Sequence, residues 1–135
     1  VGLAEKRDGR LHYNSQAALF AQSVKEMKRL LAFLGAGEDA LALGIGDLYV
    51  TVFGGRTRLI GTLLGKGYPF EKAMAELKGV TLESVVIAER AARAVRRKIA
   101  RGELREADFP LLCHLHEIIS EGKQADIPWT SFETL

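Results

Sequence analysis

The spacing of the apolar residues is the feature of this sequence that most restricts its fold. Early in the chain, apolar side chains recur at steps of four and three: Phe20, Val24, Met27, Leu31 and Leu34. In an α-helix this spacing places them on one face, so the pattern predicts a long helix with that face buried. Asn14 or Ser15 is expected to cap its start, and residues 35–37, which include two glycines, are expected to end it.

The same period returns downstream in shorter segments. It predicts helices over residues 58–65, from Pro69 or Phe70 to Lys78, from Thr81 or Glu83 to Gly102, and from Asp108, as the cap, to Gly122. Residues 38–43 are expected to form a short helical turn, and the tail is expected to pack through Trp129 and Phe132.

No segment alternates apolar and polar residues for long enough to predict a strand, so the expected fold class is all-α. One alternative stays open at Tyr49–Phe53, because its aromatic and β-branched residues also suit a strand.

The composition excludes several classes of protein. The chain has 135 residues, 47% of them hydrophobic and 27% charged, with a formal net charge of +2. These values fit one domain with a real core and lack the strong basic excess of a dedicated nucleic-acid binder. The single cysteine, Cys113, excludes an internal disulfide and is expected to be a small buried hydrophobe in a reducing, cytoplasmic setting. No apolar run reaches the roughly 18 residues of a membrane span.

The stretch from Gly44 to Arg58 holds the most specific chemistry. Asp47 and Thr51 are four residues apart, so they share one face if this stretch is helical. Gly54 and Gly55 are expected to end that helix, because glycine adopts the left-handed conformation that helix ends often need. Arg56 then stands at the start of the next element, where free N–H groups and guanidinium groups suit a phosphate. The stretch therefore predicts a site for a polyol phosphate or a similar anion.

Plainer interpretations apply to several of these residues. The Asp47–Arg56 set also fits an exposed acid and a glycine turn followed by surface arginines. The arginine-rich stretch at residues 90–101 fits a solvated helix face better than a nucleic-acid-binding helix. His114 and His116 lie two residues apart, on nearly opposite sides of a helix, so they cannot bind one metal ion together. No dinucleotide-binding or P-loop glycine motif occurs, so a nucleotide-binding fold is not expected in this chain.

Three segments carry a resemblance to a known family. They are Gly44-Ile45-Gly46-Asp47-Leu48-Tyr49-Val50-Thr51 followed by Gly54-Gly55-Arg56-Thr57-Arg58, the upstream Asp8-Gly9 with Asn14 to Leu19, and Gly79-Val80-Thr81-Leu82-Glu83. Their order and spacing resemble the C-terminal, substrate-binding half of the NAD(P)-dependent glycerol-3-phosphate dehydrogenases. The resemblance implies a multi-helical domain similar to the C-terminal domain of 6-phosphogluconate dehydrogenase. It covers nearly all of the chain.

The resemblance also implies roles for individual residues. It implies that Asp47 is a catalytic residue, which would orient a catalytic lysine. The implied substrate-binding residues are Asp47, Thr51, Gly55, Arg56 and Thr57. The implied cofactor-binding residues are Arg56, Thr81 and Glu83. No metal is implied. Three positions depart from the family pattern, because Gly55 replaces a frequent serine, Thr57 an asparagine and Ser84 a glycine.

The implied reaction is hydride transfer between dihydroxyacetone phosphate and sn-glycerol 3-phosphate, with NAD or NADP, which places the protein in glycerol-3-phosphate metabolism and phospholipid biosynthesis. Residues 1–135 would form the substrate-binding domain, and the Rossmann domain and catalytic lysine would lie outside the chain, which begins without methionine. The chain alone is therefore expected to be inactive. A homodimer is among the implied partners; nucleic acid and a membrane are not. The alternatives are a stand-alone helical binding module that has kept the fold without the chemistry and, more remotely, a nucleic-acid binder.

Overall fold

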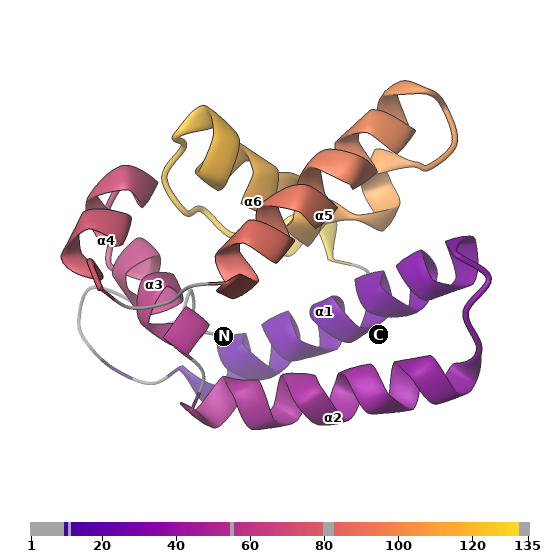
Figure 1. Ribbon diagram of the computed structural model, residues 1–135, viewed down its shortest axis with the longest axis horizontal. Helices are drawn as coiled ribbons and strands as arrows, with labels where there is room; N and C mark the ends of the chain where they lie inside the picture. The colour runs from indigo at the N-terminus through magenta and orange to yellow at the C-terminus, as the bar shows by residue number, and fades with distance from the viewer. Residues whose placement is uncertain (1–9, 11, 55, 80–82, 133–135) are drawn as a thin grey trace.

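The computed structural model describes residues 10, 12–54, 56–79 and 83–132. These residues form helices and no strand, which confirms the all-α prediction. The elements are α1 (Tyr13–Phe33), α2 (Glu38–Gly54), α3 (Arg56–Gly65), α4 (Phe70–Glu76), α5 (Glu83–Ala100), the short 3₁₀ helix η2 (Glu106–Asp108), α6 (Pro110–Glu121) and the 3₁₀ helix η3 (Trp129–Ser131). Figure 1 shows α1 and α2 side by side along one side of the molecule, α5 and α6 along the other, and α3 with α4 at one end.

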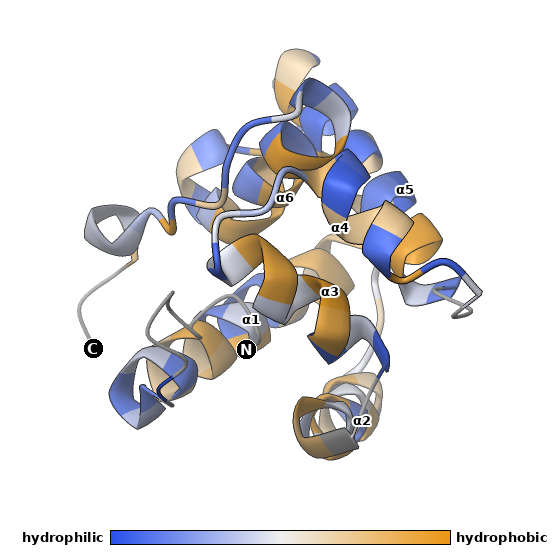
Figure 2. Ribbon diagram, turned by 90° about the vertical axis from the view of Figure 1, so that its left-hand side faces the viewer, coloured by the Kyte–Doolittle hydropathy of each residue, from blue (hydrophilic) through white to orange (hydrophobic). Residues whose placement is uncertain are grey.

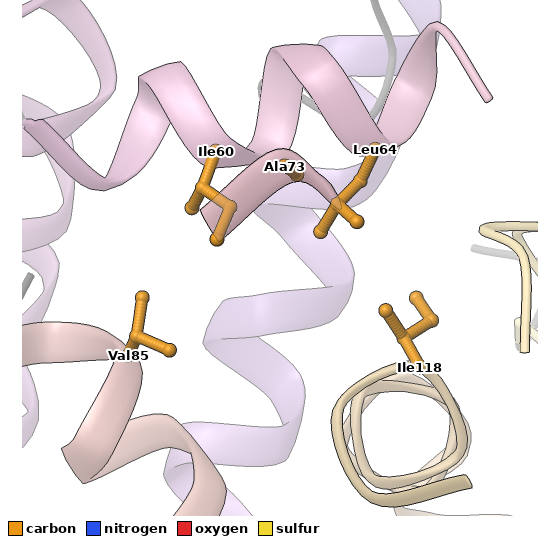
Figure 3. Close-up of a cluster of buried hydrophobic side chains, with 5 residues drawn as sticks. All are labelled: Ile60, Leu64, Ala73, Val85 and Ile118. Carbon is orange, nitrogen blue, oxygen red and sulfur yellow. The ribbon is translucent and has the colours of Figure 1, made fainter. Parts of the chain in front are cut away.

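The core lies where α3, α4, α5 and α6 meet. Figure 3 shows Val85 of α5 and Ile118 of α6 pointing toward Ile60 and Leu64 of α3, with Ala73 of α4 completing the cluster. Further along the α5–α6 pair, Val95, Phe109 and Cys113 form a second buried cluster. Cys113 is 6% exposed, which confirms its prediction as a small buried hydrophobe, and this burial raises the pKa of its thiol.

Helix α1 shows that apolar spacing can select the wrong face. The buried residues of α1 are Leu19, Gln22 and Glu26, whereas Leu34, predicted to be buried, is 67% exposed. Apolar spacing cannot reveal buried polar side chains, and two of these three residues are polar. The predicted face is half-buried instead and meets α2, where a Cβ built on Gly44 would come within 2.5 Å of the Met27 sulfur.

The helix starts also differ from the prediction. Tyr13 opens α1 after His12, so Asn14 and Ser15 lie inside the helix and cap nothing. Phe109 rather than Asp108 precedes α6, and Pro110 stands in its first turn, where a missing N–H is tolerated.

The first amides of α6 are capped from another helix. The carboxylate of Glu26 in α1 accepts hydrogen bonds from the N–H groups of Leu111, at 2.7 Å, and Leu112, at 2.9 Å. Gln22 donates to the same carboxylate at 2.8 Å. A buried side chain on α1 thus satisfies donors that a local cap would otherwise satisfy.

Helix α2 is continuous, which corrects two expectations. Residues 38–43 are part of it rather than a separate turn, and Tyr49–Phe53, where a strand was the open alternative, is helical. Helix α2 contributes no fully buried side chain among its described residues. Figure 2, which views α2 nearly along its axis, shows this helix at the edge of the fold with hydrophobic residues in it.

In the described part of the chain, no helix is long and apolar enough to cross a membrane.

Candidate functional site

The corner between α2 and α3 carries the predicted anion site. Helix α2 ends at Gly54 and α3 begins at Arg56, as the glycine pair predicted, while Gly55 lies outside the described residues. Arg56 is exposed, and within the described residues its guanidinium has no ion-pair partner. The first N–H groups of α3 have no carbonyl one turn earlier in their own helix. An exposed cation beside these donors is a favourable place for an anion.

Asp47 and Thr51 lie one turn apart on α2, but their surroundings differ. The Thr51 side chain is half-buried, and its hydroxyl donates an exposed hydrogen bond to the backbone carbonyl of Asp47 at 2.8 Å. Because that bond uses its one hydrogen, the Thr51 hydroxyl can only accept from a ligand. The Asp47 carboxylate is exposed, on the same side of α2 as Leu43 and Val50, which lie four and three residues away.

A cavity of about 290 Å³ lies beneath this corner. Its polar lining comes from Ser23, Thr51, Thr57 and Arg58, and the rest is apolar, including Leu48, Val52, Ile60 and Val85. An apolar cavity is a costly place for a doubly charged phosphate, because a buried charge needs several charged or hydrogen-bonding partners. The exposed side of the corner, next to Arg56, therefore suits an anion better than the cavity does.

The starts of α3 and α5 meet at two hydroxyl groups. Thr57 Oγ1 and Ser84 Oγ are within hydrogen-bonding contact, although 27 residues separate them in the sequence. Arg56 precedes Thr57 as the first residue of α3, and the exposed Glu83 precedes Ser84 as the first residue of α5. The structure therefore brings the predicted phosphate-binding and cofactor-binding segments together, while Thr81 lies outside the described residues.

The hydroxyl contact was missed in the sequence. In the sequence, Thr57 and Ser84 stand out only as separate departures from the family pattern. The only indication of their contact there is that both departures fall in segments assigned to the same predicted site.

Three of the five basic residues of helix α5 pair with neighbouring acids, while Arg90 and Arg97 are exposed without an ion-pair partner among the described residues. Arg93 pairs with Glu89, Arg96 with Glu106 at 2.5 Å, and Lys98 with Glu103 at 2.5 Å. This pairing favours the interpretation as a solvated helix face.

His114 has a structural environment. Its Nδ1 lies 3.0 Å from Glu117 Oε2, and its Nε2 accepts the backbone N–H of Asp126 at 3.0 Å. Since Nε2 accepts, the neutral ring carries its hydrogen on Nδ1 and donates it to Glu117. Contacts with His114 and Lys123 hold the pKa of Glu117 below its ordinary value. No group of three metal-ligating side chains occurs among the residues that the structure describes.

The chain is similar to known proteins along most of its length. The family model described as the NAD-dependent glycerol-3-phosphate dehydrogenase C-terminus matches residues 1–129. An NADP(+)-dependent glycerol-3-phosphate dehydrogenase from Archaeoglobus fulgidus is 36% identical over 118 residues, which are 84% of this chain and 33% of the relative. A glycerol-3-phosphate dehydrogenase [NAD(P)+] from Trichlorobacter lovleyi is 34% identical over 117 residues, again 84% of this chain and 33% of the relative.

The chain spans about a third of the length of these curated relatives. No solved structure matches it.

Proposed function

Because the chain belongs to the family of NAD-dependent glycerol-3-phosphate dehydrogenase C-terminal domains, as the resemblance predicted, we propose that it is the substrate-binding half of an oxidoreductase. The proposed reaction interconverts dihydroxyacetone phosphate and sn-glycerol 3-phosphate with NAD or NADP. The observation that carries the proposal is Arg56, an exposed guanidinium at the first residue of α3 with no ion-pair partner among the described residues.

The substrate phosphate binds at this corner in the proposal. The Arg56 guanidinium donates to phosphate oxygens, and the first amides of α3 and the Thr57 hydroxyl add further donors. Gly55, which precedes Arg56 in the sequence, is a further proposed substrate-binding residue. Fixing the phosphate in this way holds the carbonyl carbon in one position for reaction.

The rest of the site comes from a nucleotide-binding domain that we place N-terminal to residue 1. The length of the relatives supports this, because the chain covers only a third of them. Exposed apolar side chains support it as well: Leu43, Tyr49, Val50 and Phe53 on α2 are 60–77% exposed. The N-terminal domain covers this surface in the proposal and brings the catalytic lysine to Asp47.

The remaining residues have the following proposed roles. Asp47 orients the lysine, which exchanges a proton with the substrate oxygen, and Thr51 accepts a hydrogen bond from the substrate or the lysine. Glu83, with Thr81 before it, contacts the nicotinamide nucleotide, and Arg56 approaches it from α3. The nucleotide supplies the hydride. This chain positions the substrate and contributes no hydride donor, so it is inactive alone, and we place the complete enzyme in the cytoplasm.

The test is oxidation of NADH and of NADPH by dihydroxyacetone phosphate. The protein with its upstream nucleotide-binding domain is compared with residues 1–135 alone, both checked for folding by circular dichroism. Turnover only in the longer protein is expected. No turnover by a folded longer protein would contradict the proposal and favour a binding module that has kept the fold without the chemistry.

A further inference from the structure

The contact between Thr57 and Ser84 joins two helices at the places where the proposed ligands bind. Thr57 is the second residue of α3 and Ser84 the second residue of α5, and their hydroxyl groups are in hydrogen-bonding contact. Below them the two helices meet through apolar side chains, because Ile60 and Leu64 of α3 share a core cluster with Val85 of α5. The hydroxyl pair is thus a polar link at the exposed rim of an apolar contact.

Each hydroxyl is adjacent to a proposed ligand-binding residue. Arg56 precedes Thr57 and Glu83 precedes Ser84, both in the first turn of their helices. Thr57 is half-buried and lines the cavity, but its hydroxyl contact with Ser84 is exposed, as Arg56 is. The hydroxyl contact therefore joins the first turns of α3 and α5, which carry Arg56 and Glu83.

A hydroxyl has one hydrogen to donate and two lone pairs that accept. Either Thr57 or Ser84 can be the donor in this contact. Donation by Ser84 leaves the Thr57 hydrogen available to an anion beside Arg56, whereas the reverse arrangement uses that hydrogen on Ser84. We infer that Ser84 is a positioning residue of the anion site, which donates to Thr57 Oγ1 and directs the Thr57 hydroxyl toward the bound phosphate. This inference rests on the proposed function.

We expect the two departures from the family pattern to compensate for each other, because the Thr57 and Ser84 side chains are in contact. An asparagine at 57 would meet the Ser84 side chain, and a glycine at 84 would leave Thr57 without a partner.

Kinetics of the longer protein with dihydroxyacetone phosphate test the role of Ser84. Ser84→Ala is expected to raise KM for this substrate about 2- to 10-fold, the value of one neutral hydrogen bond, with kcat within about 2-fold. Ser84→Thr retains a hydroxyl and is expected to restore KM. Ser120→Ala, which removes an exposed hydroxyl from α6, is the matched control and should leave KM unchanged. An unchanged KM in Ser84→Ala, or an equal rise in the control, overturns the inference.

Compensation is tested with Thr57→Asn, Ser84→Gly and the double variant. Each single change is expected to raise KM. The KM of the double variant should be closer to the wild-type KM than the product of the two single effects predicts. Urea unfolding of the same four proteins gives a readout that needs no activity. If the wild type does not reduce dihydroxyacetone phosphate, the proposed function fails; coupling in unfolding would still support the link. Independent, additive effects in unfolding would overturn the link itself.

Discussion

The α5–α6 hairpin and the α2–α3 corner both carry charged and aromatic residues, but the pairing and burial of these residues differ between the two regions. In the hairpin region, charged side chains pair with one another, as Arg96 does with Glu106 and Lys123 with Glu117. At the corner, Asp47 and Arg56 are exposed, and neither has an ion-pair partner within the described residues. Several charged side chains of the hairpin region pair with one another, although Arg90 and Arg97 have no ion-pair partner among the described residues, whereas the corner exposes an acid and a base close together in sequence.

The aromatic residues differ in the same way. Phe109, at the start of α6, is 1% exposed and belongs to a core cluster, whereas Phe53 of α2 is 66% exposed and contacts Tyr49. Large exposed apolar surfaces on a folded domain often mark a site of interaction. This contrast indicates that the α5–α6 region supports the fold, while α2 presents apolar residues that a further domain is proposed to cover.

The comparison is tested most strongly by truncating one phenylalanine in each region. Phe109→Ala is expected to lower the free energy of unfolding by about 3–5 kcal/mol, because it leaves a cavity in the core. Phe53→Ala, the matched variant, should cost about 1 kcal/mol or less, because its ring is largely in solvent. Urea denaturation followed by circular dichroism measures both. Similar losses in the two variants would contradict the division into a support and an open corner.

The buried cap on α6 gives a second, smaller effect. Burial raises the pKa of Glu26, and hydrogen bonds from Gln22 and from the amides of Leu111 and Leu112 oppose that rise. Glu26→Gln keeps the shape of the side chain but replaces one carboxylate oxygen, an acceptor, with an amide NH₂ group, a donor that faces a backbone N–H. The expected loss is about 1–3 kcal/mol of unfolding free energy.

Glu76→Gln is the matched control for the cap, because Glu76 is exposed near the end of α4. It should change the unfolding midpoint little. A Glu26→Gln protein as stable as the control would show that the cap does not hold α6 in place.

The smallest expected effect comes from Glu117 and depends on pH. His114 and Lys123 lower the pKa of Glu117 below its ordinary value of 4.5. A lowered folded-state pKa contributes stability above pH 4.5 that is lost as the pH falls through the folded value. Glu117→Gln should therefore cost less than about 1 kcal/mol at pH 7, since the pair is partly exposed.

Thermal denaturation between pH 3 and 7 measures this prediction. The difference between wild type and Glu117→Gln should shrink as the pH falls below 4.5. A difference that stays constant over this range would contradict the ionic origin of the effect.

Apolar spacing predicted the helices well because their packed faces are mostly apolar. The stripe on α5 is an example, with Val85, Ala92 and Val95 buried. The prediction failed on α1, where the buried positions include Gln22 and Glu26, polar residues whose partners lie on α6. It also divided α2, because glycines inside a helix look like breaks until the packing of Gly44 against Met27 is seen.

The candidate site was predictable only where it depends on local sequence. The Asp47–Thr51 spacing acts within one turn of α2, and Arg56 stands at the start of the next helix, as expected. The Thr57–Ser84 contact joins residues 27 positions apart and depends on how α3 packs against α5. No periodic pattern in the sequence contains that information. The residue roles themselves stay predictions until they are measured.

The most direct measurement is KM for dihydroxyacetone phosphate in Arg56→Ala and Arg96→Ala variants of the longer protein. Arg56 is the exposed guanidinium of the open corner, and Arg96 is paired with Glu106 in the hairpin region. Loss of a charge-assisted hydrogen bond to phosphate is worth about 1.5–3 kcal/mol, so Arg56→Ala should raise KM roughly 10- to 150-fold. Arg96→Ala should leave it within about 2-fold, as expected for a surface ion pair away from the site. Equal effects of the two substitutions would contradict the phosphate site at the α2–α3 corner.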